Sequence, residues 1–197
     1  MGMARQLEFD RTEVLRRAMR VFWRKGFAAT STDDLLGEMG VGRQSMYNTF
    51  GDKRSLYLEA LRTYSTASVG ATLSAMFATS SVRDGIEQAL LGFATDATAA
   101  TTARACLGVH AITEFGTLAS DVKAVTDEIG ARTVLAFESR IREGIARGEL
   151  AADLDAASAA QFLLATLTGL KVAARGGADL ATLHGIVGVA MRAVVGK

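Results

Sequence analysis

TSTDDLLGEMGVGRQSMYNTFGDKRSL, residues 30–56, is the stretch of the chain that decides the fold. Ser31 can accept hydrogen bonds from the amides of the following turn while Asp34 reaches back to it, so a capping box predicts the start of a short helix. Gly40-Val41-Gly42 then supplies the backbone freedom and the single apolar side chain that a tight turn between helices needs. A second short helix follows at once, and this order is that of a helix-turn-helix motif.

The second short helix has one predicted buried side and one unusual polar side. Met46 and Phe50 repeat at i, i+4 and mark the buried side. Arginine bonds bidentately to guanine and glutamine to adenine, while tyrosine, asparagine and threonine suit phosphate oxygens. The polar side therefore predicts a DNA-reading helix, although any short polar helix in an all-helical protein would look similar. Its members are Arg43, Gln44, Ser45, Tyr47 and Asn48.

A preceding helix is predicted from a second capping box, Asp10-x-x-Glu13, with Phe9 and Val14 as a hydrophobic staple around it. A buried stripe runs along this helix and ends at Phe22. Its other face is basic, because arginines recur at i, i+4, and it places positive charge beside the predicted reading helix. The arginines of this face are Arg16, Arg17, Arg20 and Arg24.

The run from Phe9 to Leu61 resembles the three-helix DNA-binding domain of TetR-family transcriptional regulators. The resemblance lies in FDRTEVLRRAMRVFWRKGFAATSTDDLL, GVGRQSMY, FGDK and LYLEAL, with order and spacing kept. The segments CLGVHAITE and IARGELAADLDAASAAQFLLATLTGLKVAARGG are similar, more loosely, to the variable ligand-binding and dimerisation domain of that family. Gln44 stands where the family commonly has a small residue or proline, and Thr49 where it usually has histidine or tyrosine. The resemblance therefore does not predict the operator sequence.

The resemblance implies a homodimeric DNA-binding transcriptional regulator, most often a repressor that a small molecule releases from a palindromic operator. A DNA-binding domain at residues 1–52 and an effector-binding and dimerisation domain at residues 53–197 are expected. Carried over by position, Arg43, Gln44 and Ser45 would meet base edges. The phosphates would be met by Tyr47, Asn48, Thr49 and Lys53, and the DNA backbone near the preceding helix by Thr30 and Ser31.

Composition agrees with an all-α fold. The 197 residues include no proline, so nearly every segment can propagate as helix, and about nine helices are expected. The formal net charge is +1, but the first 65 residues hold eleven basic and eight acidic side chains, which concentrates positive charge around the motif. Two histidines, one cysteine and no phosphate-cradling glycine loop argue against an enzyme. No cofactor or metal is predicted.

The compartment expected from the sequence is the cytoplasm. A single cysteine excludes an internal disulfide and fits a reducing environment. The chain opens without the apolar segment of a secretory signal. Its most apolar stretches, near residues 162–170 and 186–195, are shorter than the roughly 20 apolar residues that span a bilayer, so no membrane association is expected.

Two C-terminal helices, near residues 155–174 and 179–195, are predicted to form the dimer. Each carries an apolar stripe that one subunit would not fully cover, and a two-fold four-helix interface would bury both. The alternative is that both stripes pack within their own domain. The stripes comprise Ala159, Phe162, Leu163, Thr166, Leu167 and Leu170, and then Leu183, Ile186, Val187, Ala190, Met191 and Val194.

An effector cavity, expected from the family resemblance, would take a largely apolar small molecule. Its candidate wall residues are Met76, Phe77, Phe93, Cys106, His110, Phe115 and Phe137, although apolar side chains at helical spacing also serve as plain core. Cys106, His110 and Glu114 fall at i, i+4, i+8 and share a helical face, which leaves open a thiol- or metal-responsive sensor. An architectural DNA-binding protein without an inducer is a further alternative.

Overall fold

The computed structural model describes residues 10–99 and 106–195, with the backbone alone for residues 93–99. These described residues form nine helices and no strand, so the predicted all-α fold is confirmed. The helices are α1 (Arg11–Lys25), α2 (Thr32–Met39), α3 (Arg43–Phe50), α4 (Lys53–Phe77), α5 (Val82–Ala99), α6 (Leu107–Phe115), α7 (Ser120–Ala146), α8 (Ala156–Arg175) and α9 (Leu180–Val195).

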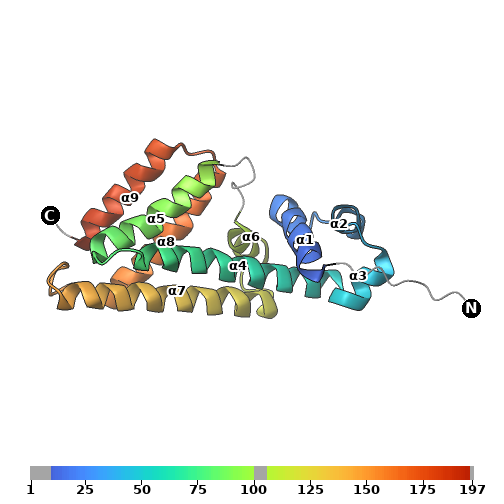
Figure 1. The fold of residues 1–197 in the computed structure, drawn as a ribbon, viewed down its shortest axis with the longest axis horizontal. Coiled ribbons are helices and arrows are strands. Elements are labelled where there is room, and N and C mark those ends of the chain that lie inside the picture. Colours follow the sequence, from blue (N-terminus) through green and yellow to red (C-terminus); the bar gives the residue numbers. More distant parts are fainter. Residues whose placement is uncertain (1–9, 100–105, 196–197) are drawn as a thin grey trace, which may run out of the picture.

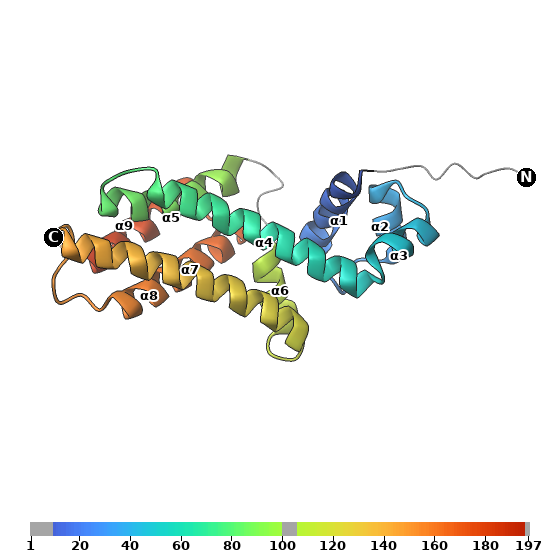
Figure 2. The ribbon, with the colours of Figure 1, turned by 60° about the horizontal axis from the view of Figure 1, so that its bottom comes forward.

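The molecule is elongated, with the head, helices α1–α3, at one end and the body, helices α5–α9, extending from it (Figure 1). The 25-residue helix α4 begins in the head and runs deep into the body, where α7 lies alongside it (Figure 2). The short helix α6 contacts α1, α4 and α7 and therefore sits at the junction of head and body. Two helices, α4 and α6, thus connect the two parts.

The predicted caps are confirmed at α2 and corrected at α1. Ser31 Oγ accepts from the amide of Asp34 at 3.0 Å, and the Asp34 carboxylate accepts from the amide of Ser31 at 2.9 Å. Gly40 then ends α2 in the left-handed conformation with φ 69°. At α1 the Asp10 carboxylate caps the helix, but Glu13 binds Arg16 and Arg17 in place of the Asp10 amide. Phe9, half of the predicted staple, lies outside the described residues.

The core of the head extends into the body. Phe22 and Tyr57 are fully buried at its centre, and Leu107 of α6 and Val122 of α7 belong to the same cluster. The boundary predicted between residues 52 and 53 falls at the start of α4, whose first turns, including Tyr57, pack in the head core. Apolar burial therefore holds the head against the body, because opening the junction would expose these side chains to water.

The C-terminal stripes are divided between two environments. Leu163 and Leu167 of α8, like Leu183 and Val187 of α9, are buried in the core of their own subunit, which corrects the expectation that the whole stripes form an interface. Apolar side chains remain exposed on the outer faces of both helices. These are Phe162 and Val172 on α8, and Leu180, Ile186 and Val189 on α9.

Helix α8 also corrects the expectation about segment length. Among the described residues it is the one helix long and apolar enough to cross a membrane. A core helix of a water-soluble protein meets the same criterion, and Leu163, Leu167 and Leu170 of α8 pack inside the subunit.

Candidate DNA interface and internal cavity

Helix α3 presents the polar face that the sequence predicts. Met46 and Phe50 are buried in the head core, so the rest of this two-turn helix must face outward. The exposed residues are Arg43, Gln44, Ser45, Tyr47 and Asn48, and Thr49 is half-buried. The N-cap of α3 is Gly42, which has no side chain, so the first amides of α3 have no side-chain cap.

Two residues of this face are held by neighbours within the head. Arg43 Nη2 lies 2.6 Å from Asp33 Oδ1, and both side chains are largely exposed. Gln44 Nε2 donates to Asn48 Oδ1 at 2.8 Å, one helical turn away. An exposed ion pair contributes only about 0–1 kcal/mol. These contacts therefore orient the side chains at little cost and can be exchanged for contacts with DNA.

The residues predicted to contact the DNA backbone differ in their accessibility. Thr30 is 1% exposed, and its hydroxyl donates to the carbonyl of Gly26 at 2.5 Å. The prediction for its side chain is corrected, because the hydroxyl closes the turn between α1 and α2. Ser31 is exposed and still has its hydroxyl hydrogen to donate, since its oxygen acts as the acceptor in the capping box. Lys53 is half-buried, with Nζ 4.3 Å from the centre of the Phe27 ring.

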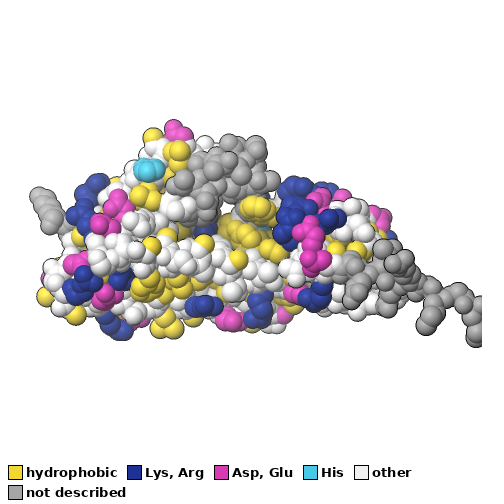
Figure 3. Space-filling model, in the orientation of Figure 1, with side chains coloured by type: hydrophobic (Ala, Val, Ile, Leu, Met, Phe, Trp, Pro, Cys, Tyr) yellow, Lys and Arg dark blue, Asp and Glu magenta, His cyan; other side chains and the backbone are white. Residues whose placement is uncertain are grey.

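The basic face of α1 carries its own counter-charges. Arg20 and Arg24 both pair with Glu38 of α2 at 3.0–3.1 Å. Arg16 and Arg17 both pair with Glu13 and, with Arg16 the larger influence, lower the pKa of that carboxyl to about 2. Figure 3 shows basic and acidic side chains intermixed over this end of the molecule. Four arginines share two glutamates, so the predicted positive face of α1 is half neutralised and keeps a net charge of +2.

The junction between head and body is made by a carboxylate and an aromatic cluster. Glu114 of α6 accepts from the backbone amides of Phe27 at 2.9 Å and Ala28 at 2.5 Å, just after α1. The rings of Phe27, Tyr57 and Phe115 meet with centroids 5.1–5.6 Å apart. Phe115, predicted as a cavity wall, therefore belongs to the junction.

Ion pairs extend the junction along α4. Arg54 lies above the Phe115 ring at 4.6 Å and pairs with Asp121 of α7 at 2.5 Å, which lowers the pKa of that carboxyl to about 2. Arg62, two turns further on, pairs with Glu128 of α7 at 2.7 Å. The part of α4 nearest the head is thus tied to α7 by charge as well as by packing.

Cys106, His110 and Glu114 do not converge on one site. His110 is buried against Arg175 of α8, and its pKa is lowered by burial first and by the Arg175 charge second. Cys106 is buried at the N-terminus of α6 and hydrogen-bonded to Tyr64, whose pKa is raised mainly by burial. Glu114 is occupied by the head. Among the described residues no group of three His, Cys, Asp or Glu side chains could hold a metal ion.

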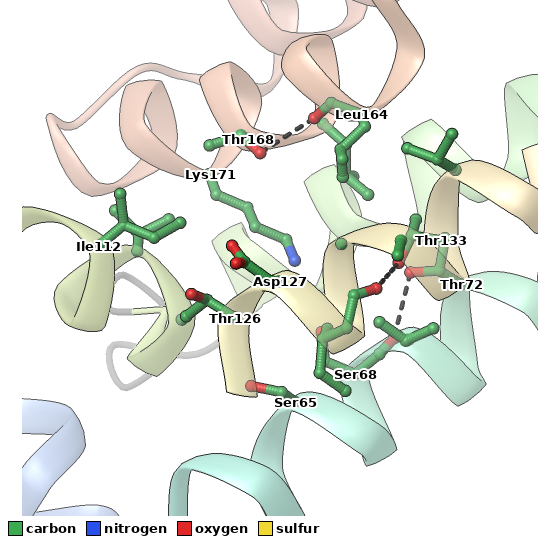
Figure 4. A pocket seen from close by; sticks show the side chains of 18 of the residues that line it. Ser65, Ser68, Thr72, Ile112, Thr126, Asp127, Thr133, Leu164, Thr168 and Lys171 are labelled. Atoms are coloured by element: carbon green, nitrogen blue, oxygen red, sulfur yellow. Dashed lines mark hydrogen bonds between the residues drawn. The ribbon is translucent and has the colours of Figure 1, made fainter. Parts of the chain in front are cut away.

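A cavity of about 660 Å³ lies in the body between α4, α6, α7 and α8. This volume suits a drug-sized molecule. Its apolar lining includes Val69, Val109, Ile112, Val134, Leu164 and Leu167. Its polar lining includes Tyr64, Ser65, Ser68, Thr72, Thr126, Thr133, Gln161 and Thr168, with three charged residues, Lys123, Asp127 and Lys171 (Figure 4).

None of the predicted wall residues with described side chains lines this cavity. Met76 and Phe137 fill the body core, and Phe77 is 53% exposed on the outside. His110 and Cys106 are buried but are not part of the cavity lining, and the Phe93 side chain lies outside the described part of the structure. Large aromatic and apolar side chains fill space between helices, so they make core more readily than cavity.

The sequence does contain a signal for the cavity walls. Ser65, Ser68 and Thr72 recur at i, i+3, i+7 on α4, and Gln161, Thr168 and Lys171 recur at i, i+7, i+10 on α8. Each set lies on one face of its helix, and that face lines the cavity. A polar stripe on a helix face that is turned toward other helices indicates water or ligand in place of core.

Comparison with known proteins places both parts of the chain. Residues 14–60 match the family described as bacterial regulatory proteins, tetR family, and residues 80–186 match the tetracyclin repressor-like, C-terminal domain. The chain is 28% identical over 188 residues to the HTH-type transcriptional repressor ComR of Escherichia coli (strain K12), spanning 93% of this chain and 88% of ComR. It is 42% identical over 84 residues to the uncharacterized HTH-type transcriptional regulator YezE of Bacillus subtilis (strain 168), a match that spans 43% of each.

Solved structures resemble the whole molecule. A cysteine mutant of the TetR family transcriptional regulator CifR, complexed with 26bp double-strand operator DNA, is 32% identical. The match has a TM-score of 0.86 and covers 98% of this chain and 100% of that one. The reduced form of NemR from E. coli is 18% identical with a TM-score of 0.83 over 93% of this chain and 96% of that one, a likeness of fold.

Two classes of DNA contact should separate by mutation. Arg43→Ala and Gln44→Ala should weaken binding to the specific site by about 1–3 kcal/mol each and relax its sequence preference, because each removes a possible bidentate base contact. Lys53→Ala should weaken specific and random DNA alike and reduce the slope of log affinity against log salt by about one. Titrations of specific and random duplexes at several salt concentrations measure both. Equal weakening of the two duplexes by Arg43→Ala would show that Arg43 does not read bases.

Proposed function

This chain belongs to the tetR family of bacterial regulatory proteins, and from that premise we propose that it is a homodimeric repressor released from its operator by a small molecule. It is a DNA-binding transcriptional regulator. The observation that carries the finer proposal is that α4 and α6 line the cavity and also hold the head. A molecule in the cavity thus touches the two helices that fix where α3 lies.

The DNA-binding half of the proposal assigns base contacts to Arg43, Gln44 and Ser45 of α3, with α3 inserted in the major groove. Tyr47, Asn48, Thr49, Lys53 and Ser31 are proposed to contact phosphates. The operator-bound CifR relative supports this geometry, and the description of ComR as a repressor supports the direction of regulation. The basic face of α1 keeps a net positive charge beside Glu13 and Glu38, so it would add non-specific attraction to DNA to the specific contacts of α3.

Release requires that the effector bind more tightly to a form of the protein that does not fit the operator. Glu114 of α6 is bonded to the head amides of Phe27 and Ala28, while Val109 and Ile112 of the same helix line the cavity. A shift of α6 on ligand binding would therefore move the head without touching the reading residues. The size of the response is limited by the difference in effector affinity between the two forms.

The dimer interface is proposed on the exposed faces of α8 and α9. Phe162 is 42% exposed and Val189 58% exposed, so neither is needed to complete the subunit core. Gly169 and Gly185 have no atoms within 4 Å of the position that a Cβ would occupy, which leaves room for a second backbone to approach. A two-fold axis would pair these faces in a four-helix interface and provide two heads for a palindromic operator. As a DNA-binding regulator, the protein is proposed to act in the cytoplasm, without catalysing a reaction and without binding a membrane.

Disruption of the outer face should abolish both dimerisation and repression. The Phe162→Glu, Val189→Glu double variant should be a folded monomer, because these side chains are exposed in the subunit but a charge would be buried unpaired in the interface. Wild type should be a dimer and should retain a DNA fragment from upstream of its own gene. On that fragment it should protect two half-sites whose centres lie about 34 Å or a multiple apart. It should also reduce transcription from the fragment. Solution mass, footprinting and in vitro transcription are the measurements.

Leu135→Glu is the matched control, since Leu135 is 65% exposed on α7. It should leave mass, footprint and repression unchanged. A wild-type monomer, or a double variant that stays dimeric, would rule out this interface. Increased transcription on the retained fragment would identify an activator, and the absence of any retained upstream fragment would contradict a self-regulating repressor.

A thiol-responsive sensor is the second candidate, favoured by the contact between Cys106 and Tyr64, a residue of the cavity wall. The proposed repressor predicts that Cys106→Ser keeps its operator affinity and its response to a small molecule, because the thiol is buried and far from α3. Operator binding with and without a mild oxidant or electrophile compares wild type and variant. Stoichiometric release of wild type that Cys106→Ser abolishes would make the protein a redox sensor.

A further inference from the structure

The charged side chains in the wall of the cavity already have partners within the protein. Lys123 and Asp127, one helical turn apart on α7, form an ion pair. Lys171 of α8 also has an interaction of its own inside the structure. A charged group on a ligand would lose its water of hydration on entry and would have to compete for these residues with the partners they have. The cavity therefore favours a ligand without a net charge.

Four threonines in the wall have committed their hydroxyl hydrogens to their own helices. Each hydroxyl donates to a backbone carbonyl about one turn earlier, at 2.8–3.1 Å. A hydroxyl that donates in this way still has lone pairs with which to accept a hydrogen bond. The four residues come from three of the helices around the cavity, and they are Thr72 of α4, Thr126 and Thr133 of α7, and Thr168 of α8 (Figure 4).

These hydroxyls distinguish a ligand that donates hydrogen bonds from one that only accepts them. An O–H or N–H group can bind a threonine oxygen while the bond to the helix carbonyl stays in place, and the two bonds then polarise each other. A ligand with acceptors alone would have to turn the hydroxyl hydrogen away from that carbonyl, so one hydrogen bond would be lost for each one gained. Ser65, Ser68 and Gln161, also in the wall, can donate or accept and suit either ligand. The threonines therefore favour a donor.

The rest of the wall is apolar and suits the body of such a molecule. Val69 of α4, Val109 and Ile112 of α6, and Leu164 and Leu167 of α8 belong to it. A wholly apolar ligand would gain the same contacts, but it would displace water from the threonine oxygens and offer no hydrogen bond in exchange. An apolar body with polar donors fits both parts of the wall.

We propose that the effector is an uncharged molecule with an apolar body and one or more hydroxyl or amide N–H groups, which donate hydrogen bonds to the threonines of α4, α7 and α8. This inference rests on the proposed function and narrows the largely apolar effector expected from the sequence. The apolar body lies against Val109 and Ile112 of α6, the helix whose Glu114 accepts from the head amides. The donors thus hold the ligand to three helices of the body while its apolar side contacts the helix bonded to the head.

Two isomers test the proposal, because 2-naphthalenemethanol has a hydroxyl donor and 2-methoxynaphthalene has only an acceptor. The full-length protein should bind one molecule of either per subunit, in mutual competition. The alcohol should bind about three- to tenfold tighter than the ether, which is what one net hydrogen bond supplies. The anion 2-naphthoate and the cation of 2-naphthalenemethanamine should both bind more weakly than the alcohol. Calorimetric titration measures all four affinities.

Threonine-to-valine substitutions keep the shape of the side chain and remove the hydroxyl. The Thr72→Val, Thr126→Val, Thr168→Val triple variant should lose the preference for the alcohol and bind the ether at least as tightly as wild type does. Serine at the same three positions should keep the preference. Thr113→Val is the matched control, because Thr113 of α6 donates to the Val109 carbonyl in the same way but is exposed and is not part of the cavity lining.

The outcomes separate the inference from the proposed function. If wild type binds the ether or either charged analogue as tightly as the alcohol, or if the triple valine variant keeps the preference, the donor class is overturned and an effector cavity remains. Failure of wild type to bind any of the four probes would overturn the cavity as a ligand site and the donor class with it. Leu164→Trp, which fills the cavity, should prevent binding of all four; persistent binding would place the probes elsewhere and overturn the proposal. Because the wild-type ranking needs no variant, the test stands even if the triple variant does not fold.

Discussion

The hydrogen bonds from the Phe27 and Ala28 amides to Glu114 are the contact on which the rest of the arrangement depends. They satisfy two backbone donors left free where α1 ends, using a charged acceptor from the body, and hydrogen bonds to a charged group are worth about 1.5–3 kcal/mol. The rings of Phe27, Tyr57 and Phe115 pack together at the same junction. Head orientation thus depends on α6 as well as on α4, and both helices also form part of the cavity wall.

The side chains proposed to read bases have their partners within the head. Arg43 rests on Asp33, and Gln44 on Asn48, through contacts that stay within the head. None of the residues that line the cavity belongs to these pairs, so in the proposed mechanism an effector would leave the base preference intact. In that mechanism the effector would alter the position of each α3 relative to the α3 of the other subunit in the proposed dimer. Because the two heads of the proposed dimer would have to meet half-sites at a fixed spacing, a small displacement at the junction would be enough to lose the second head's contacts.

Local features of the fold could be predicted from sequence, and features that depend on several helices could not. The Ser31–Asp34 capping box and the burial of Met46 and Phe50 follow from neighbours within two turns. The pairing of Glu38 with Arg20 and Arg24 depends on how α1 packs on α2. The cavity depends on four helices, and its polar stripes were outweighed in the prediction by aromatic residues such as Phe137, which fill the core.

Hydrogen exchange at two amides tests most directly whether Glu114 holds the head. In Glu114→Ala the amides of Phe27 and Ala28 should exchange at least about tenfold faster than in wild type, since a charge-assisted acceptor is lost. The amides of Leu35 and Met39, inside the head core, should exchange as before. Unchanged protection at Phe27 and Ala28 would contradict the account, because the head would then be positioned without Glu114.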